Sequence, residues 1–123
     1  MPGESVLVVD DEDSVRELIV EILEAAGFRV STASDGAEGL ERMEADTPEL
    51  VLSDINMPGM DGLALLREIK TRWADLPVMM VTAYGDDERR RRAGEYGALE
   101  FITKPVDFDL LKEQLRQLPS GAA

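Results

Sequence analysis

Residues 6–13 read VLVVDDED, an apolar run that stops abruptly at a cluster of acids. Four consecutive apolar residues rich in valine are typical of a strand that is buried on both faces of a parallel sheet. Apolar residues then recur at helical spacing over 15–26, and Gly27 stands where a helix C-cap is expected. A strand, an acidic turn and an amphipathic helix in this order predict the first part of a βαβ unit.

The same alternation continues along the chain. Four more segments are expected strands: apolar runs at 50–52 and 77–82, an alternating segment at 28–33 and a short segment at 99–103. Amphipathic stretches at 37–45, 63–73, 86–96 and 108–118 are expected helices. Five strands alternating with five helices predict an α/β fold, a doubly wound five-stranded parallel sheet covered by helices on both faces.

The composition excludes several classes of protein. The 123 residues suffice for one domain, and the absence of cysteine and histidine excludes disulfides, thiolate or Ser-His-Asp catalysis and histidine metal sites. A net charge of −13, from 13 basic and 26 acidic residues, argues against direct binding of nucleic acid. No apolar run approaches the ~20 residues of a membrane span, and the N-terminus lacks a signal sequence. We therefore expect a soluble intracellular domain without a membrane partner.

The helix expected at 86–96 differs from the others. It offers only Ala93 and Tyr96 to a core, and it carries four consecutive arginines at 89–92. In so acidic a chain we interpret these arginines as a solvated helix face rather than a nucleic-acid patch. A helix with so few apolar anchors is expected to be loosely held.

Polar residues follow the strands where each strand ends. In sheets of this class, ligands bind at the carboxyl ends of the strands, and the polar residues at those ends are Asp10, Asp11, Asp54, Thr82 and Lys104. Crowded carboxylates raise each other's pKa unless a cation joins them, and oxygen ligands suit Mg²⁺. The set predicts a magnesium-assisted phosphoryl site with a carboxylate nucleophile.

Each of these residues also has an ordinary structural explanation. The helix dipole stabilises acidic residues near a helix N-terminus, which would explain the acids at 10–13. Asp13 and Ser14 are better explained as helix N-cap residues than as ligands. An isolated Asp54 is a loop acid, an isolated Thr82 ends a strand, and an isolated Lys104 is a surface lysine. Their joint placement at the ends of separate strands is what favours a functional site.

Four segments together resemble the receiver domain of two-component response regulators. They are VLVVDDED at 6–13, LVLSDINMPGMDG at 50–62, VMMVTAYGD at 78–86 and GALEFITKPVD at 97–107. The resemblance spans residues 4–118, and 119–123 are expected to form a disordered tail or the start of a linker. It implies the flavodoxin-like strand order 2-1-3-4-5, a cytoplasmic location, and a signalling switch that catalyses only its own phosphorylation and slow autodephosphorylation.

The resemblance also implies roles for the acidic residues. Asp54 would be the phosphoacceptor, which takes a phosphoryl group from the phosphohistidine of a histidine kinase or histidine phosphotransfer protein. Mg²⁺ would be the cofactor, bound by Asp10, Asp11, Asp54 and the backbone carbonyl of Asn56. The loop residues of the family after the phosphoacceptor correspond to Pro58, Gly59 and Gly62.

Further implied roles concern the switch. Thr82 would supply the hydroxyl that closes on the phosphoryl group, Lys104 its ion-pair partner, and Phe101 the aromatic switch residue. The Lys104–Pro105 peptide bond would be cis, a form that costs little free energy only when the bond precedes proline. The face formed by 86–96, 99–103 and 108–118 would change for binding of an output partner whose identity is unknown, and phosphorylation would favour a dimer.

Two other functions compete with this interpretation. A magnesium phosphohydrolase with an aspartyl-phosphate usually has a second acid two residues after its nucleophile, where this chain has Asn56. A flavin-binding protein of similar fold would need a phosphate loop after the first strand, where the acids at 10–13 would repel the phosphate. The chain stops soon after the last expected helix, so no output domain is expected within it. A stand-alone regulator and a receiver from a longer protein such as a hybrid kinase both stay open.

Overall fold

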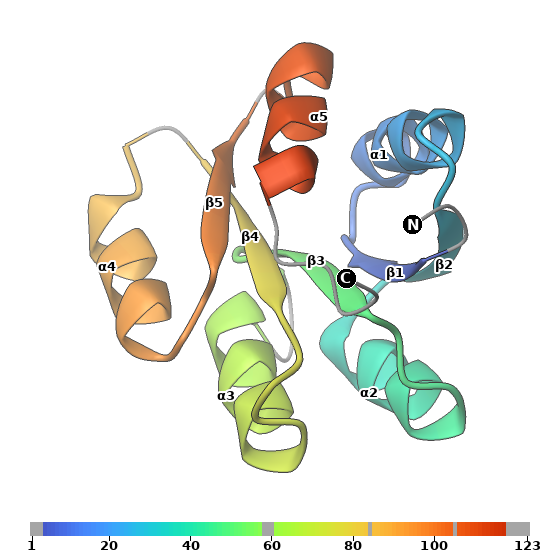
Figure 1. Cartoon of the computed structure of the whole chain (residues 1–123). Helices are drawn as coiled ribbons and strands as arrows, with labels where there is room; N and C mark the ends of the chain where they lie inside the picture. Colours follow the sequence, from blue (N-terminus) through green and yellow to red (C-terminus); the bar gives the residue numbers. More distant parts are fainter. Residues whose placement is uncertain (1–3, 58–60, 84, 105, 118–123) are drawn as a thin grey trace.

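Strands and helices alternate strictly along the chain. A computed structural model describes residues 4–57, 61–83, 85–104 and 106–117. The strands are β1 (Ser5–Val9), β2 (Arg29–Ala33), β3 (Leu50–Asp54), β4 (Val78–Thr82) and β5 (Glu100–Thr103). The helices are α1 (Asp13–Ala25), α2 (Gly36–Ala45), α3 (Gly62–Arg72), α4 (Asp87–Glu95) and α5 (Phe108–Gln117). All strand pairs are parallel, and the order β2-β1-β3-β4-β5 confirms the expected α/β fold (Figure 1).

Helices cover the sheet on both faces, with α1 and α5 on one side and α2, α3 and α4 on the other (Figure 1). Alternate side chains of β1 enter the two layers: Val6 and Val8 pack in the core under α1 and α5, whereas Leu7 and Val9 pack in the opposite core. The central strands β1, β3 and β4 are therefore buried on both faces, which explains their uninterrupted apolar runs.

The ends of α1 test two expectations. Gly27 has a φ of +96°, the left-handed conformation in which glycine commonly ends a helix, as predicted. The prediction that Asp13 and Ser14 are the N-cap residues is wrong. Glu12 is the N-cap and makes no side-chain capping hydrogen bond, and Asp13 is the first residue of the helix. The carboxylate of Asp10 accepts the backbone N–H of Glu12, so the chain turns into the helix one residue before the expected caps.

The acidic turn between β1 and α1 is held by one arginine. Arg16 donates from Nη1 to the backbone carbonyl of Asp10 at 2.8 Å and forms an ion pair with Asp13. No helix in the part of the chain described is long and apolar enough to cross a membrane.

Candidate functional site

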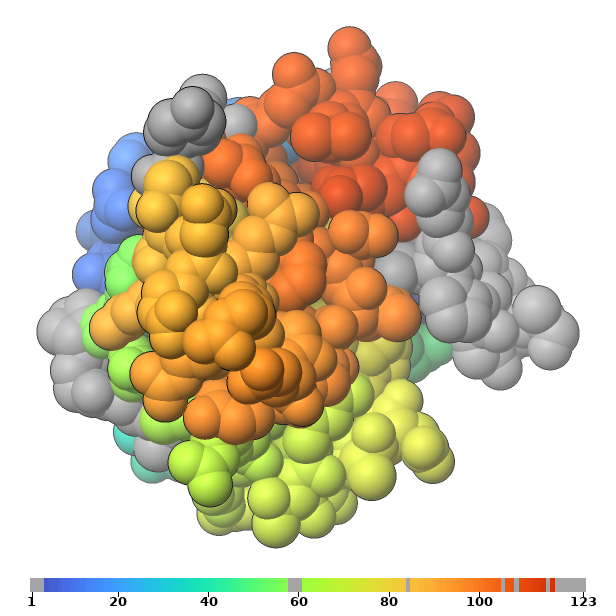
Figure 2. Space-filling view, turned by 90° about the vertical axis from the view of Figure 1, so that its left-hand side faces the viewer, coloured from blue at the N-terminus to red at the C-terminus, as the bar shows by residue number. Residues whose placement is uncertain are grey.

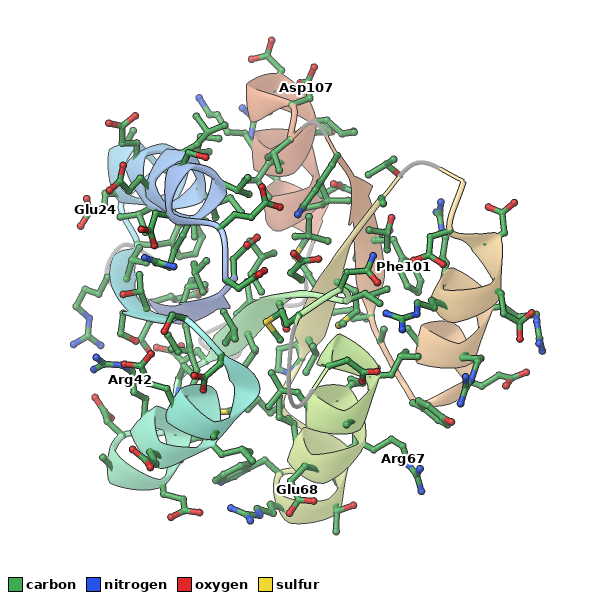
Figure 3. All side chains as sticks on the ribbon, turned by 180° about the vertical axis from the view of Figure 1, so that it is seen from behind. Glu24, Arg42, Arg67, Glu68, Phe101 and Asp107 are labelled. Atoms are coloured by element: carbon green, nitrogen blue, oxygen red, sulfur yellow. The ribbon has the colours of Figure 1, made fainter. Side chains whose placement is uncertain are left out.

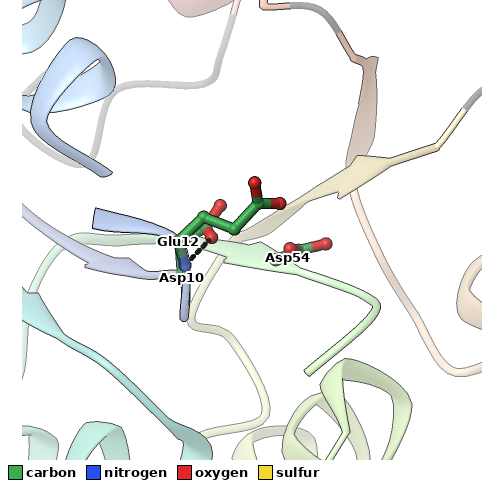
Figure 4. A group of neighbouring side chains, drawn as sticks. All are labelled: Asp10, Glu12 and Asp54. Atoms are coloured by element: carbon green, nitrogen blue, oxygen red, sulfur yellow. Dashed lines mark hydrogen bonds between the residues drawn. The ribbon is translucent and has the colours of Figure 1, made fainter. Parts of the chain in front are cut away.

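Three carboxylates gather at the carboxyl ends of β1 and β3. Asp10, Glu12 and Asp54 each offer an oxygen, and these oxygens lie within 4.8 Å of one another (Figure 4). Asp10 and Asp54 are only 1% and 2% exposed, whereas Glu12 is exposed. Because β1 and β3 are neighbours in a parallel sheet, their carboxyl ends meet at one edge, as the sequence predicts.

Asp10 is a buried acid with one oxygen that has no partner among the described residues. Its Oδ1 accepts the Glu12 N–H at 2.9 Å, whereas its Oδ2 is buried and has no hydrogen-bond partner among the described residues. Burial raises the pKa of Asp10 to about 6; the Glu12 N–H opposes this shift, and the charge of Asp54 adds to it. The direction agrees with the expected effect of crowding, but burial contributes most. An orphaned buried oxygen costs free energy unless a ligand satisfies it.

Lys104 is the cation of the site. Its Nζ donates to Oδ2 of Asp54 at 2.9 Å and to Oε1 of Glu12 at 3.0 Å. Burial lowers the pKa of Lys104, but the hydrogen bonds to Asp54 and Glu12 outweigh that effect and hold the pKa above its usual range. Lys104 therefore stays protonated beside the buried carboxylate of Asp54.

Backbone contacts join the strand ends around Asp54. The Asn56 N–H donates to Oδ1 of Asp54 at 3.1 Å. Thr82 is buried at the end of β4, and its carbonyl accepts the Lys104 N–H at 2.8 Å, which ties the end of β4 to the end of β5. An open pocket of about 280 Å³ lies beside Thr82 and beneath the first turn of α4.

Two predicted site residues lie at its margin. Asp11 is exposed and is not part of the group of three carboxylates, so its role as a metal ligand stays a prediction. Phe101 is half-buried on β5 and packs against the core between the sheet and α4 (Figure 3). The guanidinium of Arg90 lies 5.0 Å from the centre of its ring.

Glu12 is the residue of the site that sequence reasoning missed. It stands in the acidic run at 10–13, but only the turn at Asp10 shows that its carboxylate reaches Lys104. The two residues are 92 positions apart in the chain.

Comparisons with known proteins decide the family. The model of the response regulator receiver domain matches residues 6–116. The chain belongs to this receiver family. It is therefore a module of two-component signalling and not an enzyme, and receiver domains take phosphoryl groups from histidine kinases or phosphotransfer proteins.

Three relatives show how far the likeness of this receiver extends. The DNA-binding transcriptional regulator NtrC of Escherichia coli is 46% identical over 104 residues, 85% of this chain but 22% of that protein, so the chain spans about a fifth of its length. Sporulation initiation phosphotransferase F of Bacillus subtilis is 32% identical over 95% of this chain and 94% of its own length. The crystal structure of the receiver domain of NtrX from Brucella abortus has a TM-score of 0.88 and 39% identity, covering 91% of this chain and 95% of that one.

The donor set of this receiver fits Mg²⁺. An acidic cluster such as Asp10, Glu12 and Asp54 is typical of the Mg²⁺ site of receivers. All its ligand atoms are carboxylate oxygens, which Mg²⁺ prefers, and the unpartnered Oδ2 of Asp10 is a buried acceptor that a cation would satisfy.

The loop after Asp54 is packed tightly at the start of α3. A β-carbon at Gly62 would lie 2.2 Å from the backbone carbonyl oxygen of Asp54, so only glycine fits there. Pro58, Gly59 and Pro105 lie outside the described residues, as does the expected tail at 119–123, and so does the predicted cis bond between Lys104 and Pro105.

Proposed function

We propose that Asp54 accepts a phosphoryl group from a phosphohistidine of a histidine kinase or histidine phosphotransfer protein. The observation that carries the proposal is the environment of its carboxylate, which is 2% exposed and is held by the Asn56 N–H and Lys104 Nζ. A nucleophile held in one orientation beside a fixed cation is suited to a reaction whose catalysis consists of positioning and charge stabilisation.

The transfer requires one oxygen of Asp54 to attack the phosphorus atom. The new O–P bond forms as the P–N bond to the donor imidazole breaks, and the imidazole nitrogen keeps the electron pair of that bond. Lys104 balances the negative charge of the phosphoryl oxygens, and the Asn56 N–H keeps the carboxylate in its orientation. Thr82, at the neighbouring strand end, donates its hydroxyl to a phosphoryl oxygen once the phosphoryl group is in place.

Mg²⁺ would be held by Asp10, Asp11, Asp54 and the Asn56 carbonyl, with Glu12 at the edge of the site. When bound, it supplies positive charge that offsets the repulsion between these carboxylates and an incoming phosphate. Asp10 is suited to bind it because one of its oxygens is buried without a partner among the described residues.

The nucleophile is tested by incubating the chain with Mg²⁺ and acetyl phosphate and measuring its intact mass. We expect one phosphoryl group on the wild type and none after Asp54→Asn or when EDTA replaces Mg²⁺. Asp75→Asn, at an exposed acid of the α3–β4 connection, is the matched control and should be labelled like the wild type. Labelling of Asp54→Asn equal to that of the wild type would refute the assignment.

The switch is expected to connect Thr82 to Phe101. Phosphorylation should draw the Thr82 hydroxyl towards the phosphoryl group, and the space vacated should admit the ring of Phe101. Thr82→Ala should therefore still be phosphorylated, yet its NMR shifts at Phe101 and in α4 should no longer respond. Thr103→Ala, at the same pocket, is the control that keeps the response. An equal response in the wild type and Thr82→Ala would contradict the coupling.

We infer that the face formed by α4, β5 and α5 changes on phosphorylation and binds an output partner or a second phosphorylated copy. Figure 2 shows this face, with α4 towards the viewer and α5 above it. A cytoplasmic location is the setting in which a histidine kinase would reach Asp54.

A further inference from the structure

None of the described residues in the first turn of α4 is buried, and polar contacts join that turn to the rest of the chain. Ala93 is the one buried residue that the structure describes in α4, and it lies towards the end of the helix. Beneath the first turn is the open pocket of about 280 Å³, lined in part by Thr82, Asp86 and Arg90. A helix end above a pocket needs another anchor to keep its position.

That anchor is a group of four side chains, which we call the clasp: Asn56, Asp61, Asp86 and Arg89. The Asn56 amide donates from Nδ2 to Oδ2 of Asp86 at 3.2 Å, and its Oδ1 accepts a hydrogen bond from Arg89. Arg89 also lies 3.9 Å from Oδ2 of Asp61, whose other oxygen accepts the Ala64 N–H at 2.9 Å and caps α3. The clasp therefore joins α4 to the segment between β3 and α3.

Arg89 is distinct within the run of four arginines. Arg91 pairs with Glu88 and Glu95 of its own helix, and Arg92 donates to the hydroxyl of Tyr96, which follows that helix. Arg90 stacks on the ring of Phe101. Among the described residues of α4, Arg89 is the arginine that reaches the β3–α3 segment, so the run is not only a solvated face.

The clasp acts on the same residue that touches Asp54. The side chain of Asn56 is held by α4, while its backbone N–H donates to Oδ1 of Asp54 at 3.1 Å. The backbone directly before Asn56 has little freedom, because the Ile55 N–H donates to the Val81 carbonyl and the Ile55 carbonyl accepts the Gly62 N–H. A displacement of Asn56 therefore disturbs either its hydrogen bond to Asp54 or its contacts with α4.

We infer that Arg89 is a positioning residue that acts through Asn56, and that the clasp links occupancy of the acidic site to the position of α4. This inference rests on the proposed function for its setting, and it adds a connection independent of Thr82 and Phe101. By linkage, a ligand that fixes Asn56 must also favour the position of α4 in which the clasp is formed. Loss of the clasp must therefore weaken the binding of that ligand.

The test uses the full chain and Mg²⁺ alone. Amide hydrogen exchange over 87–95 and the Mg²⁺ dissociation constant are measured for the wild type, Arg89→Gln, Asn56→Ala and the double variant. We expect Mg²⁺ to slow exchange in the wild type. Each single variant should lose most of this effect and bind Mg²⁺ about threefold to tenfold more weakly, the size of effect seen when a residue that couples two sites is changed. The double variant should lose less than the sum of the two single losses, because both single variants remove the contact between Arg89 and Asn56.

Two further variants separate positioning from general effects. Arg91→Gln removes the same charge from the same helix but no contact to Asn56, so it should respond to Mg²⁺ like the wild type. Arg89→Lys keeps the charge and should recover part of the response. Additive losses in the double variant, an equal loss in Arg91→Gln, or absence of a Mg²⁺ effect on α4 in the wild type would each overturn the inference.

The effect of Mg²⁺ on hydrogen exchange in α4 does not depend on the proposed phosphorylation of Asp54. Acetyl phosphate labelling of the same proteins at saturating Mg²⁺ should give one phosphoryl group on the wild type and on Arg89→Gln. Failure of labelling in the wild type would refute Asp54 as phosphoacceptor, whereas the clasp is judged by its Mg²⁺-dependent exchange alone.

Discussion

Gly62→Ala should lower the free energy of unfolding by about 3 kcal/mol, because the new methyl group has no space. An ideal β-carbon at this position lies 2.2 Å from the Asp54 carbonyl oxygen and 2.5 Å from the α-carbon of Ile55. Both neighbours are backbone atoms of a buried strand end, so neither a side-chain rotation nor a small shift relieves the overlap. The variant should also bind Mg²⁺ more weakly, because the overlap displaces the backbone of Asp54 or the adjoining start of α3.

Gly94→Ala is the matched control for this prediction. Gly94 is exposed in α4, and its β-carbon would lie 3.9 Å from the Phe101 ring, an ordinary contact. Because alanine favours a helix over glycine, this variant should gain about 0.5–1 kcal/mol. Urea unfolding in EDTA measures both changes. A Gly62→Ala protein as stable as the wild type would show that the start of α3 is not packed against Asp54 as described.

Asp10→Asn should stabilise the metal-free chain at pH 8. The pKa of Asp10 is about 6 in the folded chain against an ordinary value of 3.8. Between these values the folded state keeps a proton that the unfolded state has lost. The stability from this proton is fully present below about pH 4 and is lost as the pH rises through about 6. Two pKa units correspond to about 3 kcal/mol, which sets the upper limit of the gain.

The pH series isolates this effect from that of other acids. In EDTA, the difference in unfolding free energy between Asp10→Asn and the wild type should be near zero at pH 4 and should grow up to pH 7. Mg²⁺ should make the wild type more stable than Asp10→Asn at neutral pH. At a concentration of a hundred times its dissociation constant, Mg²⁺ stabilises the wild type by about 2.7 kcal/mol, and the variant should lose most of this gain. An Asp10→Asn protein that is less stable than the wild type in EDTA at pH 8 would show that the buried charge of Asp10 does not destabilise the metal-free chain.

Asp11→Asn separates metal binding from burial. Asp11 is exposed and contributes least among the causes of the shift at Asp10, so this variant should change metal-free stability little. If Asp11 binds Mg²⁺, as the family resemblance implies, the variant should still lose the stabilisation by Mg²⁺.

The fold could be predicted from the sequence because burial on both faces leaves a simple pattern. β1, β3 and β4 are buried along their whole lengths apart from the first residue of β1, and their apolar runs stand out between amphipathic helices. The convergence of Asp10, Asp54 and Lys104 followed from the same pattern, because parallel strands end at one edge of the sheet. The start of α1 was missed because a side-chain contact of Asp10, and not a capping residue, sets it.

Contacts between distant side chains could not be predicted in this way. The pairing of Glu12 with Lys104 depends on how the turn after β1 aims a long side chain. Arg89 and Asn56 are 33 positions apart, and nothing in an arginine run shows which member leaves its own helix. The unpartnered Oδ2 of Asp10 is likewise a property of the packed structure and not of the residue.

Locating the phosphoryl group in the chain shows whether Asp54 is the phosphoacceptor. After incubation with acetyl phosphate and Mg²⁺, borohydride reduces an aspartyl phosphate to homoserine, which peptide mass measurement assigns to one position. We expect reduction at Asp54 and at no other acid. Reduction at Asp10, Asp11 or Glu12, or a phosphorylated chain in which Asp54 is unchanged, would contradict it.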